Sequence, residues 1–240
     1  MASRTENVTI DGSNMKMYVS EPDGQGNFPA VLLIMEIFGV SDHIKGLADR
    51  MAKEGYVVLA PDLFHREGPD AVCAYDDPRA FQWRGNLRDE GIINDLRASI
   101  DYLQGQANVQ SDKMGITGFC LGGRVSYLGA TVFPEIKASS VFYGGRILAP
   151  FGEGPSPLDR TTGISGPVLG LFGEEDQNPS PDDVKKIEAE LVKHGKTYDF
   201  HSYPGAGHGF VCDERDSYRQ DAATDGWART VDWFQKYLKV

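Results

Sequence analysis

The chain has 240 residues, of which 40% are hydrophobic and 25% charged, and its formal net charge is −11. This composition can build a substantial core and argues against disorder. The acidic balance argues against nucleic acids and anionic membrane surfaces as partners, because both attract basic patches. If the substrate is an anion, a local cluster of arginines must overcome this acidic field.

The start of the chain and its cysteines indicate a reducing compartment. Residues 1–7 lack the apolar core of a signal peptide, and no apolar run approaches the roughly 18 residues that span a bilayer. Cys73, Cys120 and Cys212 are odd in number and lack metal-ligand spacing. We therefore expect no disulfide scaffold and no zinc site, and a cytoplasmic location. Without repeats or a linker, residues 1–240 are expected to form one domain.

The predicted elements begin with a hairpin, because the alternating segments 8–10 and 15–20 flank Asp11-Gly12-Ser13-Asn14. After it, short apolar runs alternate with segments of helical periodicity. The predicted strands are 30–35, 56–60, 114–117, 138–143, 167–172 and 197–203, and the predicted helices are 42–54, 89–104, 124–133, 181–193 and 222–238. This order predicts an α/β fold with a mostly parallel sheet, helices on both faces, and ligands at the carboxyl ends of the strands.

Two regions interrupt the alternation. Residues 62–85 mix arginines and aromatics with Gly, Pro and Asp, and we expect a loop with short helices over a pocket. Residues 146–166 form a long excursion rich in Gly and Pro. Whether this excursion folds over the site is left open by the sequence.

The spacing Gly118-Phe119-Cys120-Leu121-Gly122 lies where a predicted strand meets a predicted helix. So tight a turn strains the central residue, and glycines beside it remove the clashes. The pattern predicts a nucleophile elbow. The positive end of the helix favours a thiolate, and its free N–H groups can receive an oxyanion. A small buried cysteine in a turn explains the motif equally well, so the rest of the chain must decide.

Two further polar side chains follow predicted strands. Asp176 comes after the strand 167–172, and His208 comes after the strand 197–203. The order nucleophile, acid, histidine is that of α/β-hydrolases. In such a triad the thiolate attacks, the imidazole shuttles a proton, and the carboxylate fixes the imidazole tautomer.

Each triad position has rivals. Glu174 and Glu175 could replace Asp176, but as the first residues of their loop we expect them to be solvated. His201 could replace His208, but it lies in the middle of a predicted strand. The other histidines are expected to be solvated on helices and loops; they are His43, His65 and His194.

Glu36 directly follows the buried strand 30–35, where a carboxylate is costly without a partner. One interpretation is a helix-capping or solvated glutamate. The functional interpretation places Glu36 beside the elbow, where it could hydrogen-bond the Cys120 thiol or accept its proton. The backbone N–H of Ile37 would then join that of Leu121 as an oxyanion hole.

Five segments together resemble the dienelactone hydrolase family (carboxymethylenebutenolidases) of α/β-hydrolases. They are Glu-Ile-Phe-Gly-Val at 36–40, Ala-Pro-Asp-Leu-Phe at 60–64, Gly-Phe-Cys-Leu-Gly-Gly at 118–123, Gly-Glu-Glu-Asp at 173–176 and Gly-His-Gly-Phe at 207–210. The resemblance covers nearly the whole chain and implies the α/β-hydrolase fold. It implies a Cys120–His208–Asp176 triad, with Glu36 helping to activate the thiol when substrate binds. It also implies an oxyanion hole from the N–H groups of Ile37 and Leu121.

The resemblance weakens where the substrate would bind. Typical members hold a substrate carboxylate with arginines, one of them four residues after the histidine, and Cys212 stands there in this chain. The second arginine has no secure counterpart, although Arg79 and Arg84 lie near its place. Arg215 is a candidate substitute for the first. Catalysis therefore carries over better than specificity for dienelactones.

The sequence thus predicts a hydrolase that opens a small lactone or ester through a Cys-His-Asp triad and an acyl-enzyme, without cofactor or metal. A general carboxylesterase or thioesterase on the same triad, and a non-catalytic small-molecule binding protein of the same fold, remain alternatives. A redox-sensing thiol at Cys120 is a third, but no resolving cysteine is close in sequence. The natural substrate and the choice between monomer and homodimer are left open.

Overall fold

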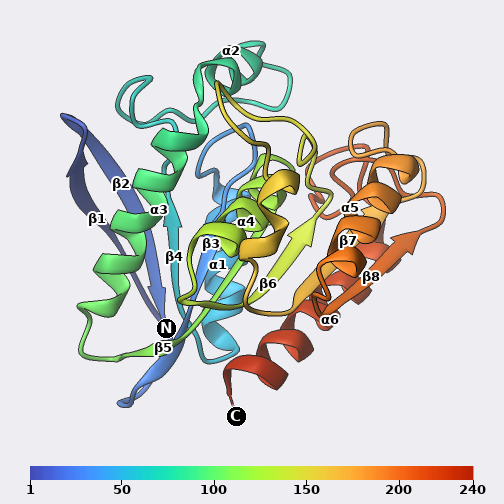
Figure 1. Cartoon of the computed structure of the whole chain (residues 1–240). Helices are drawn as coiled ribbons and strands as arrows, with labels where there is room; N and C mark the ends of the chain where they lie inside the picture. The colour runs from blue at the N-terminus through green and yellow to red at the C-terminus, as the bar shows by residue number, and fades with distance from the viewer. Residues whose placement is uncertain (240) are drawn as a thin grey trace.

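An eight-stranded sheet organises the computed structural model, which describes residues 1–239 (Figure 1). The strands are β1 (Ala2–Ile10), β2 (Ser13–Glu21), β3 (Phe28–Ile34), β4 (Val57–Pro61), β5 (Val109–Phe119), β6 (Ile136–Phe142), β7 (Val168–Gly173) and β8 (Tyr198–Tyr203). The α-helices are α1 (Asp42–Lys53), α2 (Arg79–Asn86), α3 (Asp89–Gln104), α4 (Leu121–Val132), α5 (Pro181–Lys193) and α6 (Gln220–Leu238). A 3₁₀-helix, η1 (Leu158–Gly163), lies in the predicted excursion.

The strand order is β1-β2-β4-β3-β5-β6-β7-β8. The hairpin β1–β2 is antiparallel and joins β4 in antiparallel fashion, whereas the strands from β4 to β8 pair in parallel. This arrangement confirms the predicted fold class, an α/β-hydrolase with a mostly parallel sheet and an N-terminal hairpin. The hairpin is longer than its apolar alternation indicated, because its strands stay paired from Ala2 to Glu21 with mostly solvent-facing side chains in β1.

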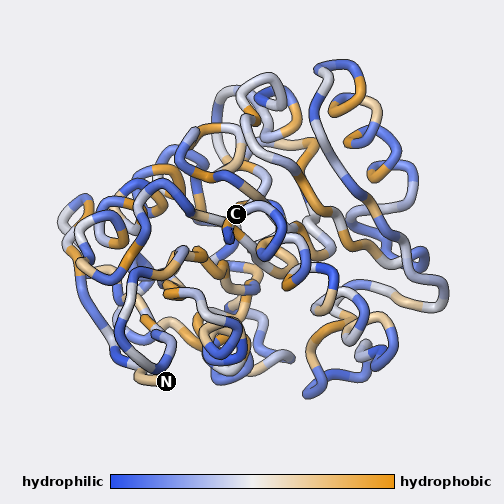
Figure 2. Tube along the Cα trace, turned by 90° about the horizontal axis from the view of Figure 1, so that it is seen from below, coloured by the Kyte–Doolittle hydropathy of each residue, from blue (hydrophilic) through white to orange (hydrophobic). Residues whose placement is uncertain are grey.

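Helices cover both faces of the sheet, as predicted. The helices α3, α4 and α5 lie on one face, and α1 and α6 lie on the other (Figure 1). The central strands β3 and β4 are buried almost throughout, which explains their continuous apolar sequence. In the hydropathy-coloured trace, apolar stretches run through the interior (Figure 2). None of the helices in residues 1–239 is both long and apolar enough to cross a bilayer.

Local sequence signals explain where the helices begin. The Ser41 side chain accepts a hydrogen bond from the N–H of Ile44 and caps α1. Ser180 and Asp183 form a reciprocal capping box, with proline in the first turn of α5. The helix α4 begins at Leu121, three residues before its predicted start, so Cys120 occupies its N-cap position. The sheet therefore delivers the elbow directly to a helix N-terminus.

Candidate active site

Cys120 lies between the end of β5 and the start of α4, in a strained conformation. Its φ of 59° and ψ of −114° are unusual for a residue other than glycine. The backbone is held there because the N–H of Cys120 donates a 3.1 Å hydrogen bond to the carbonyl oxygen of Phe142 in β6. The side chain is consequently raised at the carboxyl edge of the sheet.

The two glycines of the motif are required by close packing. A Cβ atom on Gly118 would lie 2.4 Å from the carbonyl oxygen of Gly122. A Cβ atom on Gly122 would lie 2.2 Å from the carbonyl oxygen of Ile34 in β3. Neither distance is possible for an alanine, so the spacing G-x-C-x-G is what allows the turn to close against the neighbouring strand.

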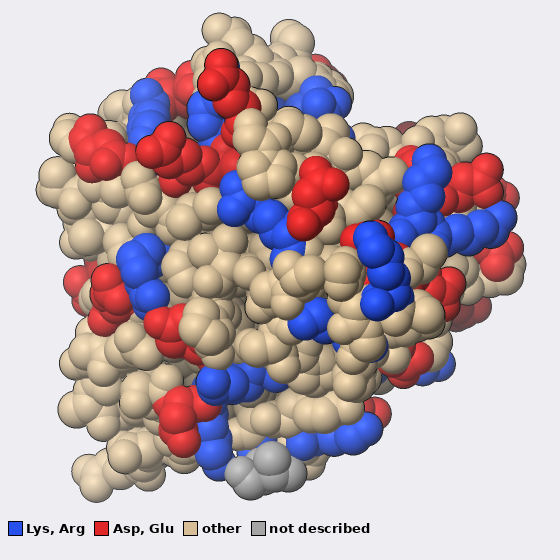
Figure 3. All heavy atoms as spheres, viewed as in Figure 1, with Lys and Arg blue, Asp and Glu red and all other residues tan. Residues whose placement is uncertain are grey.

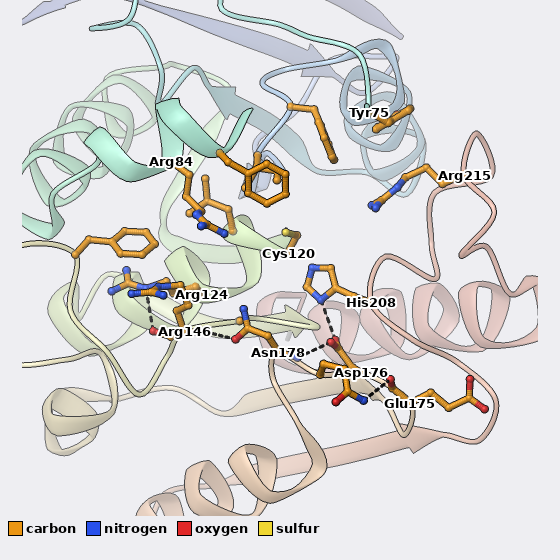
Figure 4. Close-up of a pocket in the computed structure, with 17 residues that line it drawn as sticks. Tyr75, Arg84, Cys120, Arg124, Arg146, Glu175, Asp176, Asn178, His208 and Arg215 are labelled. Atoms are coloured by element: carbon orange, nitrogen blue, oxygen red, sulfur yellow. Dashed lines mark hydrogen bonds and ion pairs between the residues drawn. The ribbon is translucent and has the colours of Figure 1, made fainter. Parts of the chain in front are cut away.

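His208 and Asp176 approach Cys120 from the loops that follow β8 and β7. His208 Nδ1 lies 2.8 Å from Asp176 Oδ2, and Asp176 is only 2% exposed. The other Asp176 oxygen accepts a 2.8 Å hydrogen bond from the N–H of Asn178, which fixes the carboxylate. In Figure 4 the imidazole stands between Asp176 and the Cys120 sulfur.

The environment of His208 favours its cation. Burial works to lower its pKa, but the attraction of the Cys120 thiolate and hydrogen bonds to Asp176 and Cys120 outweigh burial and raise the pKa of His208 to about 10. A thiolate–imidazolium pair of this kind is the reactive form of a cysteine nucleophile. The arrangement can therefore generate a nucleophile and supply a proton to a leaving group.

The rival residues lie outside the Cys120–His208–Asp176 arrangement, although Glu175 lines the same cavity. Glu174 and Glu175 are exposed, and His201 lies in β8 with Asp199 Oδ2 3.1 Å from its Nε2 atom. The expectation of solvated histidines was wrong for two positions. His65 is buried, with Asp95 3.1 Å from its Nε2, and the side chain of His43 is only 8% exposed. Nothing in the local sequence of either histidine distinguishes a buried position from a surface one.

A cavity of about 400 Å³ opens over Cys120. Both residues predicted for the oxyanion hole, Ile37 and Leu121, line it together with Cys120, Asp176 and His208. The N–H of Leu121 is the first of α4, so it has no acceptor within the helix. Aromatic side chains form much of the remaining wall; they are Phe38, Tyr75, Phe81 and Phe151.

Arginines give this cavity a positive character although the chain is acidic. On the face seen in Figure 3, basic and acidic side chains are interspersed, whereas four arginines line the cavity against two acids. Arg84, Arg124 and Arg146 gather on one side of Cys120, and Arg215 lies on the other (Figure 4). This is the local cluster that an anionic substrate would require.

The four arginines differ in their partners. Arg124 is buried and forms a two-pronged pair with Asp89, at 2.7 and 3.1 Å, so its charge is already matched. In residues 1–239, neither Arg84 nor Arg146 has a carboxylate partner. Arg79, predicted as a binding residue, does not line the cavity; it is 60% exposed and paired with Asp77 at 2.6 Å.

Sequence reasoning missed Arg124 and Arg146. Arg146 had a usable signal, because it follows Gly144-Gly145 at the carboxyl end of a predicted strand, and it adopts a φ of 62°. Arg124 had none, since nothing in its local sequence shows that a helical arginine is buried beside a cavity. Among the predicted arginines, the structure brings Arg84 and Arg215 to the cavity.

Glu36 follows β3 but does not line the cavity. It is 1% exposed, and Arg215 Nη1 lies 3.6 Å from its Oε1 atom. In residues 1–239 neither carboxylate oxygen has a hydrogen-bond partner. Burial raises the pKa of Glu36, opposed by the positive charge of Arg215 and His208. The expected partner of Glu36 was the Cys120 thiol, whereas its nearest cation in this structure is Arg215.

Comparisons with known proteins agree with this architecture. Residues 15–238 match the model of the Dienelactone hydrolase family. A Synechocystis sp. protein named "Putative carboxymethylenebutenolidase" is 39% identical over 98% of each chain. A Bradyrhizobium sp. protein named "Probable 2-oxo-3-(5-oxofuran-2-ylidene)propanoate lactonase" is 31% identical over 98% of this chain and 97% of that one.

A crystal structure of a "Putative Dienelactone Hydrolase" from Klebsiella pneumoniae superposes with a TM-score of 0.86 at 33% identity, covering 99% of this chain and 100% of that one. The family model spans almost the whole sheet, from β2 to α6, and includes the elbow and both loops that carry Asp176 and His208. These findings confirm the resemblance seen in the sequence, and the chain belongs to the dienelactone hydrolase family.

Proposed function

We propose that the chain hydrolyses a small lactone or ester with Cys120 as nucleophile, His208 as acid and base, and Asp176 as the group that orients His208. The observation that carries this proposal is the strained Cys120 at the N-terminus of α4, next to a 2.8 Å His208–Asp176 pair, in one cavity. Nucleophile, base and orienting acid are thus within reach of one bound carbonyl group.

The proposed reaction has two stages. The Cys120 sulfur attacks the carbonyl carbon, and the N–H groups of Ile37 and Leu121 stabilise the oxyanion. Imidazolium at His208 then gives its proton to the leaving oxygen as the C–O bond breaks, which leaves a thioester on Cys120. In the second stage His208 takes a proton from water, the hydroxide attacks the thioester, and the carboxylic acid leaves as the thiolate is restored.

Glu36 belongs to the proposal as the group that controls the thiol. It faces Arg215 and does not line the cavity. A substrate carboxylate that binds Arg215 would compete with Glu36 for that cation. Glu36 would then be released toward Cys120 and could take the proton of any Cys120 that is still a thiol, which completes the thiolate–imidazolium pair with His208 when substrate is present.

The proposed substrate carries a negative charge beside its lactone or ester bond. Arg84 and Arg146 line the cavity without a carboxylate partner in residues 1–239, and an unmatched guanidinium favours a carboxylate ligand. The Bradyrhizobium relative is named for a propanoate that carries a furanone ring. We therefore place the carboxylate of the substrate between Arg84 and Arg146 or against Arg215, with its carbonyl over Cys120.

The test is a turnover screen with wild type and Cys120→Ala side by side. Its substrates are matched pairs: a lactone with and without a carboxylate, an aryl ester and a thioester. We expect fastest turnover of the carboxylate-bearing lactone and a mass increase of one acyl group on wild type during rapid quenching. Faster turnover of the thioester or the neutral ester would assign the chain to general esterases or thioesterases. No turnover and no acyl mass would favour a binding protein.

The remaining sequence predictions stand beside this proposal. We propose one domain over residues 1–240 and a cytoplasmic location, which suits three free cysteines: Cys73, Cys120 and Cys212.

A further inference from the structure

Behind the wall of the catalytic cavity, three potential metal ligands meet. Glu36 follows β3, His43 lies in the first turn of α1, and Cys212 lies in the segment between β8 and α6. One carboxylate oxygen, one imidazole nitrogen and the sulfur all lie within 4.8 Å of one another. Sequence spacing could not reveal this cluster, because Cys212 lies more than 160 residues after Glu36 and His43.

Two of the three side chains are buried with unsatisfied polar atoms. Glu36 is 1% exposed and the His43 side chain 8% exposed. In residues 1–239, both oxygens of Glu36 and the Nε2 atom of His43 have no hydrogen-bond partner. Buried polar groups in native proteins are almost always satisfied, and each orphan costs free energy. These atoms therefore leave the cluster with open binding capacity.

We propose that Glu36, His43 and Cys212 bind a zinc ion, with a fourth position left to water. A carboxylate, an imidazole and a thiolate are ligand types that Zn²⁺ takes, and the two negative ligands balance its charge. Tetrahedral bonds of about 2.0 to 2.3 Å place neighbouring ligand atoms roughly 3.5 Å apart. The side chains would thus close by about an ångström around the ion.

The surroundings of His43 suit this role. Its Nδ1 atom, on the other side of the ring from Nε2, lies 3.9 Å from Oδ1 of Asp213. Histidines that bind zinc commonly direct their second ring nitrogen to such a carboxylate, which fixes the ring and strengthens the ligand. Asp213 is therefore the expected outer partner.

An entry path for a cation reaches the same imidazole. A second cavity of about 340 Å³ is lined by His43 and by three acidic residues, with Arg50 as its basic member. The acids are Asp42, Asp213 and Glu214. Clefts lined mainly by one sign of charge concentrate ions of the opposite sign. The zinc ion would enter here, through a cavity whose lining does not include Cys120.

Two contacts must adjust when the ion binds. The Cys212 thiol donates a 3.3 Å hydrogen bond to the Tyr75 hydroxyl, and its proton must leave to solvent before the sulfur can bind zinc. Arg215 Nη1 stands 3.6 Å from Oε1 of Glu36 and repels a cation. The second carboxylate oxygen is equally free, so one oxygen can face zinc while the other keeps its arginine.

The consequence for catalysis rests on the proposed function of Glu36. A carboxylate held by zinc between His43 and Cys212 cannot move toward Cys120. Bound zinc would therefore keep Glu36 away from the catalytic cavity and lower turnover, and removal of the zinc would restore turnover. The binding site and this inhibition are separable, so they are tested separately.

Binding is measured in the full chain carrying Cys73→Ala and Cys120→Ala. This background removes the catalytic thiol, which together with His208 could bind zinc in competition with the proposed site. It leaves Cys212 as the sole thiol. Calorimetric titration with Zn²⁺ is expected to give one equivalent. His43→Gln and Cys212→Ala should each weaken it at least about 100-fold, and Asp213→Asn about 10-fold, as outer partners do. His194→Gln, which alters a histidine paired with Glu190, is the matched control and should change nothing.

Titration with Co²⁺ gives a second readout, a thiolate-to-cobalt charge-transfer band that requires Cys212. This band keeps the test valid if Cys212→Ala fails to fold. Three results would overturn the site. They are an absence of zinc binding, zinc binding that survives His43→Gln, and cobalt binding without the charge-transfer band. In proteins that retain Cys120, the zinc concentration that halves turnover should be about 10-fold higher for His43→Gln than for the protein with His43. This change is smaller than the roughly 100-fold loss of binding, because zinc also binds weakly at the catalytic thiol. An unchanged value together with confirmed binding would overturn the inhibition alone.

Discussion

The molecule contains two sets near one end of its sheet that each combine a cysteine, a histidine and a carboxylate. Cys120, His208 and Asp176 meet at the catalytic cavity, with the histidine and the acid 2.8 Å apart. Cys212, His43 and Glu36 meet behind the wall of that cavity, within 4.8 Å of one another but with the acid and the histidine unsatisfied. The comparison shows that geometry, and not residue type, separates a reactive set from a latent one.

The two thiols illustrate the difference. Cys120 stands at the N-terminus of α4, beside His208, whose pKa is raised through its contact with Cys120. Cys212 is fully buried, and burial raises the pKa of its thiol, so it stays protonated and donates to Tyr75. The first sulfur is therefore expected to react, and the second to remain inert unless a metal displaces its proton.

The largest effect should come from replacing each of the two cysteines by alanine in separate variants. Cys120→Ala is expected to lose at least about 10⁴-fold in kcat/KM, the scale of nucleophile deletions in triads. Cys212→Ala should lose less than about 10-fold, because its sulfur touches no part of the proposed reaction path. Steady-state kinetics on the preferred ester or lactone measures both.

Iodoacetamide provides the control. Labelling of Cys120, located by peptide mass analysis, should stop turnover, and substrate should protect it, whereas labelling of Cys73 alone should leave turnover intact. If purified Cys120→Ala retained activity, or if modification confined to Cys73 or Cys212 abolished it, the nucleophile would have been assigned to the wrong thiol.

The next largest effect concerns Asp176, the acid that is hydrogen-bonded to His208. Asp176→Asn should lower kcat about 10³-fold, since an amide can hold the imidazole in the wrong tautomer. It should also lower the pKa of His208 from about 10, because the mutation removes a hydrogen bond and a negative charge that favour the cation. The pH dependence of kcat/KM and NMR titration of the imidazole report the two changes.

Stability should follow the same pKa. A histidine with a raised pKa in the folded state stabilises fully below its ordinary value of 6.5, and this contribution is lost as the pH rises toward about 10. The free energy of unfolding of wild type relative to His208→Gln should therefore fall between pH 6.5 and 10. The same difference measured in an Asp176→Asn background should depend less on pH; equal slopes would mean that Asp176 does not hold the cation.

The catalytic set of Cys120, His208 and Asp176 was largely predictable from sequence. The motif Gly118-Phe119-Cys120-Leu121-Gly122 identified the elbow because its glycines are forced by backbone packing, a local constraint that sequence records. Asp176 and His208 followed because parallel strands bring their carboxyl ends to one edge. The structure accordingly brings these three side chains together at one cavity.

The latent set was not predictable for the opposite reason. Glu36, His43 and Cys212 come from three segments whose contact depends on how α1 and the segment before α6 pack against β3. No periodicity or motif records that packing. The same limit applied to Arg79, whose local neighbourhood resembled that of Arg84 although only Arg84 turns into the cavity.

A smaller effect should come from Glu36, the acid of the second set. Glu36→Gln is expected to lower kcat about 10- to 100-fold, the contribution of a general base. It should nevertheless leave Cys120 at least as reactive toward iodoacetamide without substrate, because the resting Glu36 lies outside the cavity and faces Arg215. A nearby negative charge disfavours a second anion, so its removal cannot hinder the thiolate.

The measurement is the rate of labelling as a function of pH in wild type and Glu36→Gln, without and with a saturating substrate analogue. Aspartate at this position is a useful second variant, since Glu36→Asp keeps the charge but shortens the reach. Markedly slower labelling of Glu36→Gln without analogue would show that Glu36 already holds the Cys120 proton at rest, and the gating role would be abandoned.

The smallest effect tests whether the unmatched arginines recognise an anion. Arg84 and Arg79 lie on α2, one helical turn and a half apart, but only Arg84 lines the cavity, while Arg79 is paired with Asp77 at the surface. They form a matched pair of charge removals. A hydrogen bond to a charged group is worth about 1.5 to 3 kcal/mol, which corresponds to roughly 10-fold or more in KM.

We therefore expect Arg84→Gln to raise KM about 10-fold for a carboxylate-bearing lactone and to leave KM for a neutral ester of similar size within about 2-fold. Arg79→Gln should leave both within about 2-fold, since its partner and its place are on the surface. Raised salt should reproduce part of the Arg84 effect in wild type, because screening weakens the same attraction. If Arg84→Gln raised KM equally for charged and neutral substrates, Arg84 would be shaping the cavity rather than binding a carboxylate. The anion would then have to be assigned to Arg146 or Arg215, or the substrate would be neutral.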